Sequence, residues 1–211
     1  MKLFHGSKKI VSKPIPSGSK EDNDYGPAFY TTPDLESAHE WSCRNESVGF
    51  VNYYNLSLDD LKILDLTKMP IMNHLAILLH FRKLDSGFVD AFSYRLELIE
   101  KHFYIDISKY DVVIGYRADD AYFRFPLDFV RGNLTLEQLE YSYKLGNLGI
   151  QYVLISSKAF KKLKYLKSLE SDSKYISQYF KKVFEATKRF NELNKDEDGI
   201  RIMDIIRDIK K

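Results

Sequence analysis

The hydrophobic pattern predicts short β-strands over residues 3–7, 28–31 and 149–155, three segments that lie far apart in the chain. Residues 3–7 and 149–155 each carry one polar side chain among apolar ones, while residues 28–31 are aromatic and hydroxyl-bearing, as strands often are. Each strand therefore presents a polar group from an otherwise apolar segment.

A helix is predicted over residues 34–41, directly after the second strand. Pro33 suits the first helical position because its missing N–H would be unpaired there, and Thr32 suits the N-cap. The apolar residues of this helix recur at helical spacing, at Leu35, Ala38 and Trp41. A strand that ends in hydroxyls and turns straight into a helix is a common wall of a ligand site.

Three more strands are predicted. Residues 48–56 and 61–66 are rich in strand formers or alternate in polarity, and we expect them to pair across the turn at residues 57–60. Residues 111–115 form an apolar run bounded by Gly, which indicates a buried strand.

Helical periodicity predicts further helices over residues 70–84, 90–103, 175–193 and 200–209. Another helix opens at Thr135, whose capping-box partner is Gln138. The segment 122–130 is left unassigned because Pro126 interrupts a helix. Asp119 and Asp120 are adjacent, so an N-cap role for one of them is favoured over a metal or acid–base site.

The composition indicates a globular chain of 211 residues, long enough for one domain with an elaboration, since 44% of the residues are apolar and 29% are charged. A net charge of +2 permits a nucleic-acid partner without requiring one. The lone Cys43 excludes an internal disulfide and a multi-cysteine metal site. No metal is predicted at His74 and His80 either, because they are six residues apart and do not share a helix face, and both are expected at the edge of the core or on the surface. Without a membrane-length apolar run or a signal peptide, the plain expectation is a cytoplasmic protein with no membrane partner.

Residues 8–25 have the composition of a loop, with Pro14, Pro16 and Gly18 followed by an acidic cluster. Because this loop joins the first two predicted strands, it could close over a ligand. A passive surface connection explains the same composition, and both interpretations stay open.

Four motifs occur in a recognisable order along the chain. They are Leu-Phe-His-Gly-Ser at residues 3–7, Tyr-Gly-Pro-Ala-Phe-Tyr-Thr-Thr at 25–32, Asp-Val-Val-Ile-Gly-Tyr-Arg-Ala-Asp-Asp at 111–120, and Ile-Gln-Tyr at 150–152. Together they resemble a family of small bacterial proteins, labelled as a domain of unknown function, in the diphtheria-toxin and poly(ADP-ribose)-polymerase-like branch of the ADP-ribosyltransferase superfamily. The resemblance covers roughly residues 2–165.

The resemblance implies an α+β fold with two small packed antiparallel sheets around an NAD+ cleft, surrounded by helices. It assigns residues 1–165 to the ADP-ribosyltransferase-like domain and 166–211 to a helical C-terminal extension. His5, Tyr30 and Gln151 would be catalytic: His5 would donate a hydrogen bond to the ribose, and Tyr30 would stack on nicotinamide. The residues implied to bind the dinucleotide are Gly6, Ser7, Phe29, Thr31 and Thr32. Each of these residues, taken alone, is also explained by packing or capping.

Gln151 and Ala28 depart from the superfamily pattern. Many transferases have Glu where Gln151 stands, and Gln keeps the hydrogen-bond geometry without the charge or the capacity to act as a base. An acceptor activated elsewhere, weak activity and NAD+ binding without turnover all fit this change. The family of closest resemblance also carries Gln at this position, which favours activity. The family has Gly where Ala28 stands, so its Cβ could crowd the turn before Phe29.

The implied function is mono-ADP-ribosylation of a macromolecular acceptor, protein or nucleic acid, with NAD+ as co-substrate and no metal. Small proteins of this type resemble the toxins of toxin–antitoxin systems, and the C-terminal helices could hold an antitoxin protein. The alternatives are an NAD+ glycohydrolase, which admits water instead of an acceptor, and a non-catalytic module that binds NAD+ or ADP-ribose.

Overall fold

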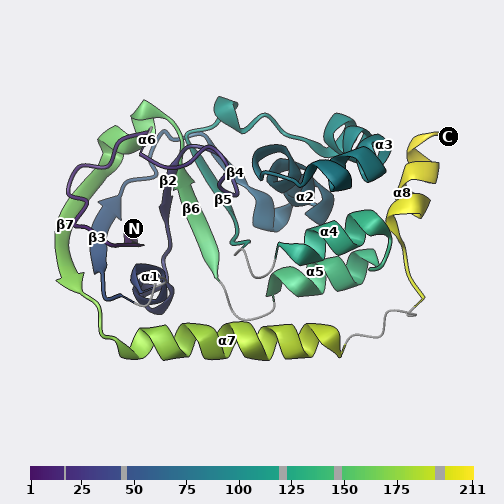
Figure 1. Cartoon of the computed structure of the whole chain (residues 1–211). Helices are drawn as coiled ribbons and strands as arrows, with labels where there is room; N and C mark the ends of the chain where they lie inside the picture. The colour runs from purple at the N-terminus through teal and green to yellow at the C-terminus, as the bar shows by residue number, and fades with distance from the viewer. Residues whose placement is uncertain (17, 44–46, 119–122, 145–148, 193–197) are drawn as a thin grey trace.

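The computed structural model of the chain combines two β-sheets with a set of α-helices, which places the fold in the α+β class. The sheets lie at one end of the molecule, and most of the helices gather at the other end (Figure 1). The residues that the structure describes are 1–16, 18–43, 47–118, 123–144, 149–192 and 198–211.

The first sheet has three antiparallel strands in the order β1 (Lys2–Ser7), β3 (Phe50–Leu56) and β7 (Leu163–Glu170). Strand β7 was not anticipated from the sequence. Its exposed residues Lys164 and Lys167 give this edge strand charges, which discourage pairing with another chain. The predicted boundary between residues 165 and 166 falls inside β7, so the C-terminal extension is not wholly helical.

The second sheet has the strand order β2 (Phe29–Thr31), β6 (Ile150–Leu154), β5 (Val112–Tyr116) and β4 (Ile63–Asp65). Its first three strands are antiparallel, but β4 runs parallel to β5, so the prediction of two purely antiparallel sheets was wrong. Short 3-10 turns follow β4 at Leu66–Lys68 and precede β5 at Ile107–Lys109.

The predicted pairing of residues 48–56 with 61–66 was also wrong, because β3 and β4 belong to different sheets. Two hydrogen bonds hold the chain against the start of β5 just before β4 begins. The amide of Asp111 donates to the carbonyl oxygen of Lys62 at 2.8 Å, and the amide of Lys62 donates to the Asp111 carboxylate at 2.7 Å. A partner 49 residues away therefore determines where β4 lies.

The two sheets meet where β1 passes the end of β2. Phe4 and Thr32 exchange two backbone hydrogen bonds of 2.8 and 2.9 Å, an isolated bridge between the sheets. Apolar side chains from both sheets fill the space between them: Leu3, Phe29, Tyr54, Leu56, Val112 and Leu154. This junction brings His5 of β1 beside Tyr30 of β2.

Helix α1 (Leu35–Ser42) follows β2, as predicted, but its N-cap is not Thr32. Asp34 caps the helix by accepting a hydrogen bond from the amide of Glu36 at 2.9 Å. The hydroxyl of Thr32 instead accepts from the amide of Asp34 at 3.1 Å, one step earlier. Pro33 therefore lies before the helix, not in its first turn.

A second apolar core, separate from the one between the sheets, lies among four helices: α2 (Ile71–Phe81), α3 (Ser86–Phe103), α4 (Arg124–Arg131) and α5 (Leu136–Lys144). The predicted helices 70–84 and 90–103 correspond to α2 and α3. The capping box of α5 is confirmed, because Thr135 and Gln138 exchange hydrogen bonds of 3.0 and 3.2 Å between backbone and side chain. The buried side chains of this core include Leu75, Leu78, Ile99, Phe125, Phe129 and Leu139.

Helix α4 occupies a segment that the sequence left unassigned because of Pro126. Pro126 is the third residue of the helix, where the backbone amide has no partner within the helix in any case. The helix ends at Gly132, whose φ of 90° gives the left-handed conformation of a C-cap. Asp119 and Asp120, for which an N-cap role was predicted, lie outside the described residues.

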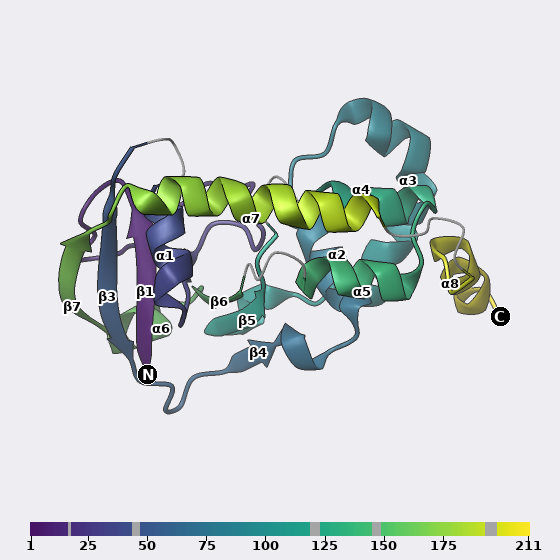
Figure 2. The same cartoon turned by 90° about the horizontal axis from the view of Figure 1, so that it is seen from below.

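The C-terminal part contains α6 (Ser157–Lys162), α7 (Lys174–Asn191) and α8 (Ile202–Ile209), and the last two confirm the predicted helices. Helix α7 runs along the molecule from α1 to α4 (Figure 2). Lys182 forms an ion pair of 2.6 Å with the buried Glu40 of α1, and Phe190 stacks on Phe125 of α4 with ring centroids 3.6 Å apart. No helix in the described ranges has the length and apolar character needed to cross a membrane.

Candidate functional site

The three residues predicted to be catalytic converge on one cavity. His5, Tyr30 and Gln151 all line a cavity of about 450 Å³ between the sheets and the C-terminal end of α2. Its other lining residues come from β1, from the loop 8–25, from α1 and from the segments that follow α2 and β5: Gly6, Gly18, Ser19, Lys20, Asn23, Asp24, Trp41, Arg82, Arg117 and Ala118. This volume lies within the usual range for small-molecule sites.

Strand pairing explains the convergence. Strand β2 pairs antiparallel with β6 and sets Tyr30 opposite Val153, two residues from Gln151. The bridge between Phe4 and Thr32 then holds β1 against the same end of β2. Residues that are 25 to 121 positions apart in the sequence therefore come together, and the side chains of His5 and Thr31 hydrogen-bond to the carbonyl oxygens of Tyr30 and Tyr152.

His5 is fixed by a hydrogen bond of 2.7 Å between its Nδ1 and the carbonyl oxygen of Tyr30. Because a carbonyl oxygen only accepts, Nδ1 must carry the proton, and burial lowers the pKa of the ring and favours its neutral form. The other ring nitrogen, Nε2, is then an acceptor. The predicted donation of a hydrogen bond from His5 to a ribose hydroxyl needs a protonated Nε2, whereas Nε2 of the neutral ring can only accept one.

Tyr30 presents its ring to the cavity and uses its hydroxyl to hold the preceding loop. The hydroxyl donates to the carbonyl oxygen of Gly26 at 2.6 Å and accepts from the amide of Tyr25 at 3.0 Å. Gly26 has a φ of 68°, which glycine adopts readily. Burial raises the pKa of the Tyr30 phenol well above its usual range, so the group stays protonated.

Tyr30→Phe is expected to lower the free energy of unfolding by about 1–3 kcal/mol, because two backbone groups lose their partner while the ring remains. Chemical denaturation measures this difference. Tyr141→Phe is the matched control, since Tyr141 is 44% exposed. Equal stability of Tyr30→Phe and the wild type would show that these hydrogen bonds do not hold the loop.

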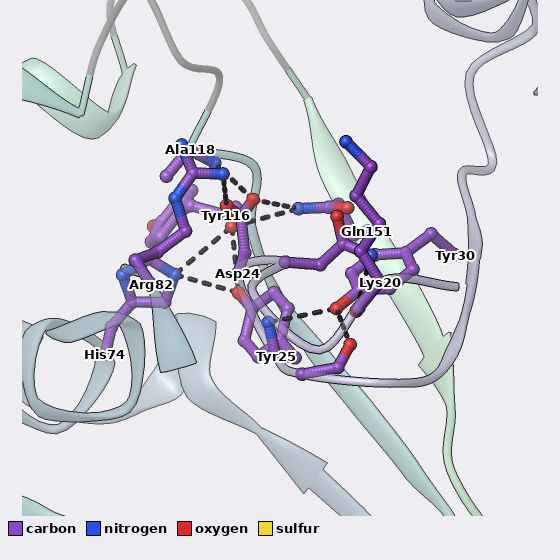
Figure 3. A network of polar contacts seen from close by, with 11 residues as sticks. Lys20, Asp24, Tyr25, Tyr30, His74, Arg82, Tyr116, Ala118 and Gln151 are labelled. Carbon is purple, nitrogen blue, oxygen red and sulfur yellow. Dashed lines mark hydrogen bonds and ion pairs between the residues drawn. The ribbon is translucent and has the colours of Figure 1, made fainter. Parts of the chain in front are cut away.

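Asp24 lies beside Gln151 and was not recognised from the sequence (Figure 3). Its carboxylate accepts hydrogen bonds from the Ala118 amide at 3.0 Å and from Nε2 of Gln151 at 3.1 Å, and it pairs with Arg82 Nη1 at 3.3 Å. Burial raises the pKa of Asp24 from 3.8 to about 6, although Arg82 and these hydrogen bonds oppose the increase. The only local signal was its place directly before the Tyr25–Gly26 turn.

Cationic groups outnumber this carboxylate among the described residues that line the cavity. Arg82 follows the last residue of α2, Arg117 is 4% exposed just after β5, and Lys20 is exposed on the loop. The guanidinium of Arg117 lies 4.7 Å from the centre of the Trp41 ring. Two arginines and a lysine on one cavity suit a ligand with phosphate groups.

Four residues predicted to bind the dinucleotide do not line the cavity. Phe29 is packed in the core between the sheets, and the Thr31 hydroxyl donates to the carbonyl oxygen of Tyr152 at 2.6 Å. Successive strand residues face opposite sides, so these neighbours point away from the side that Tyr30 faces. Thr32 is buried beside the start of α1, and Ser7 accepts from Nδ2 of Asn52 at 2.9 Å. Gly6 does line the cavity.

The two histidines of α2, His74 and His80, form contacts within the protein. His74 was predicted at the edge of the core or on the surface, but it is 1% exposed and shares a hydrogen bond of 2.8 Å with the Tyr25 hydroxyl. Burial lowers its pKa to about 4. His80 pairs with Glu100 on the surface at 2.8 Å. Within the described ranges, no three His, Cys, Asp or Glu side chains gather closely enough to hold a metal ion.

Comparison with known proteins identifies one family. The model of a family described as a protein of unknown function, DUF3990, matches residues 1–165, which carry His5, Asp24, Tyr30 and Gln151. No protein with curated annotation and no solved structure matches the chain. Because the family model covers well over half of the 211 residues, the chain belongs to the DUF3990 family.

Proposed function

We propose that the protein is a mono-ADP-ribosyltransferase that uses NAD+ and transfers ADP-ribose to a macromolecular acceptor, a protein or a nucleic acid. The observation that carries the proposal is the convergence of His5, Tyr30 and Gln151 on one cavity. The sequence motifs suggest this chemistry only if these three side chains meet. The resemblance to ADP-ribosyltransferases supplies the identity of the substrate.

The cavity has groups suited to each part of NAD+. The Tyr30 ring can stack on nicotinamide, an aromatic contact on the order of 1 kcal/mol. Nε2 of His5 can accept a hydrogen bond from a ribose hydroxyl and thereby fix the sugar. Arg82, Arg117 and Lys20 provide positive charge for the pyrophosphate.

In the proposed reaction, the bond between nicotinamide and the ribose C1′ breaks first, and its electron pair leaves with nicotinamide. The acceptor nucleophile then bonds to C1′ and loses its proton. Catalysis depends on a fixed substrate geometry and on stabilisation of positive charge at the ribose. The carbonyl oxygen of Gln151 and the nearby carboxylate of Asp24 bring negative potential to this side of the cavity.

The loop 8–25 contributes Gly18, Ser19, Lys20, Asn23 and Asp24 to the cavity wall. Of the two interpretations that the sequence allowed, this contribution supports a loop that takes part in the site. We propose that the loop is part of the NAD+ site and that its Lys20 end contacts the phosphates. Helix α1 completes the wall with Trp41.

Incubation of the purified protein with NAD+ labelled in the adenylate, with and without cell lysate, tests the proposal. We expect label in macromolecules and release of nicotinamide in the presence of lysate. Free ADP-ribose without transfer would indicate the glycohydrolase. Binding of NAD+ without consumption, measured by calorimetry, would indicate the non-catalytic module, and neither binding nor consumption of NAD+ would contradict both the transferase and the glycohydrolase.

A further inference from the structure

The carboxamide of Gln151 is held in one orientation by acceptors on its nitrogen side. Nε2 donates to Asp24 Oδ2 at 3.1 Å and faces the carbonyl oxygen of Tyr116 at 3.5 Å (Figure 3). A carboxylate and a carbonyl oxygen can only accept hydrogen bonds, so the amide cannot turn over without losing both. Its Oε1 accepts no hydrogen bond within the described part of the chain, and Gln151 lines the cavity.

The Asp24 carboxylate is itself fixed from several elements. The Ala118 amide after β5 and Arg82 after α2 hold its two oxygens, and Asp24 is only 7% exposed. Glu21 and Asp22 of the same loop are exposed. The chain has therefore buried one particular carboxylate against the amide that occupies the position of the superfamily's Glu.

We propose that Asp24 is a positioning residue that carries the negative charge of the site and directs the Gln151 carbonyl oxygen toward the ligand. The proposal rests on the proposed function for the identity of the ligand. The charge that many ADP-ribosyltransferases place on the residue at position 151 would then be supplied here by a neighbouring side chain. Gln151, oriented by Asp24, would then act on the ligand as a fixed dipole.

This arrangement makes a glutamate at position 151 harmful. Gln151→Glu replaces the donor that faces Asp24 with a second acceptor, so two carboxyl groups would lie about 3 Å apart and could not both be ionised without repulsion. The superfamily pattern taken alone suggests the opposite, that glutamate at this position increases activity. Asp24→Asn restores a donor opposite the introduced carboxylate and moves the charge to position 151, but it removes the oxygen that accepts from the Ala118 amide, so the two substitutions should compensate each other in part.

A comparison of four proteins at pH 7.5 tests whether Asp24 positions Gln151: the wild type, Asp24→Asn, Gln151→Glu and the double variant. Asp22→Asn, at an exposed position of the same loop, is the matched control. We expect Gln151→Glu to lower the melting temperature and to reduce NAD+ consumption about tenfold or more, since like charges repel at close range. The double variant should have a higher melting temperature and a higher rate of NAD+ consumption than Gln151→Glu. Equal or higher activity of Gln151→Glu, or losses that simply multiply in the double variant, would overturn the proposal.

The pH dependence separates positioning from a purely structural role. The groups that face Asp24 are the guanidinium groups of Arg82 and Arg117 and the phenols of Tyr25, Tyr30 and Tyr143, whose pKa values burial raises. Asp24 therefore loses its charge as the pH falls through its pKa of about 6. The ratio of wild-type to Asp24→Asn activity should be high at pH 8 and fall toward one below pH 6. A ratio that does not change with pH would overturn the positioning role.

Protonation of Asp24 should lower the activity but raise the stability of the folded state. A carboxyl group whose pKa is raised in the folded state binds its proton more tightly there than in the unfolded chain. The wild type should therefore gain stability relative to Asp24→Asn as the pH falls from 7 toward 4. His5 and His74 oppose this gain in both proteins, because burial lowers their pKa values, and the comparison cancels them.

Failure of the proposed function would be visible separately. If the wild type neither binds nor consumes NAD+, the transferase proposal is wrong, but the melting temperatures of the four proteins still test the pair. A loss in Gln151→Glu that Asp24→Asn restores would support the positioning of Gln151, and additive losses would overturn it. If Asp24→Asn does not fold, the melting temperature and activity of Gln151→Glu decide alone.

Discussion

His5→Ala is expected to reduce kcat/KM for NAD+ by about two to three orders of magnitude, the loss typical when one group that stabilises the reacting centre is removed. The imidazole is held by the Tyr30 carbonyl oxygen at 2.7 Å, so Nε2 has a fixed position at the cavity. Alanine removes this acceptor and the contact of the ring with Phe29, whose centroid lies 4.6 Å away. A radiometric or fluorescent assay of nicotinamide release measures the change.

His80→Ala provides the matched control, because His80 pairs with Glu100 on the surface of α2 and does not line the cavity. His5→Gln is the second variant, since the glutamine side chain can return an acceptor close to the position of Nε2. We expect it to recover part of the activity lost in His5→Ala. Unchanged kcat/KM in a folded His5→Ala protein would show that the imidazole does not contact the substrate.

Gly6→Ala is expected to lower the free energy of unfolding by about 3 kcal/mol or more, at or beyond the upper end of the usual cost of overpacking. A Cβ at position 6 would overlap the carbonyl oxygen of Ala38 and lie 2.7 Å from the amide nitrogen of Ser42. Both atoms belong to the backbone of α1 and cannot move aside as a flexible side chain would. The corresponding decrease in melting temperature is roughly 6–12 °C for a chain of this size.

Gly87→Ala is the control for this prediction. Gly87 lies in the first turn of α3, where an added Cβ would meet only Oδ1 of Asp85, at 3.2 Å. We expect a change of less than about 1 kcal/mol there, in either direction. If Gly6→Ala melts at the wild-type temperature, then α1 does not depend on the close approach of β1. Gly6 was predicted to bind the dinucleotide, and its packing against α1 is a second and independent reason for a glycine at this position.

The sequence allowed the three polar positions of the candidate site to be predicted because each belongs to a short strand with a clear pattern. His5, Tyr30 and Gln151 each interrupt an apolar or aromatic segment, and their order along the chain matched a known series of motifs. The same reasoning failed for Phe29 and Thr31, which it assigned to the ligand together with Tyr30. Alternation along a strand places these neighbours on the opposite face, so only one side of β2 could belong to the cavity.

Asp24 and the pairing of β4 could not be predicted because their partners are remote. In the sequence, Asp24 cannot be distinguished from the other acidic residues of its loop. In the fold it contacts Arg82, Ala118 and Gln151, which are 58, 94 and 127 residues away. The place of β4 likewise depends on Asp111, and a turn at residues 57–60 says nothing about it. Local pattern determines which elements form, whereas burial and long-range hydrogen bonds determine which loop carboxylate becomes part of a site.

Helix α7 supports residues 1–165, the stretch that defines the family, although it lies outside that stretch. Glu40 is 3% exposed, and its counter-charge Lys182 belongs to α7. A fragment cut after residue 165 would remove the ion-pair partner of this buried carboxylate, and it would also remove the ring that stacks on Phe125. Helix α7 thus supports α1, which forms one wall of the cavity, and is not a detachable appendage.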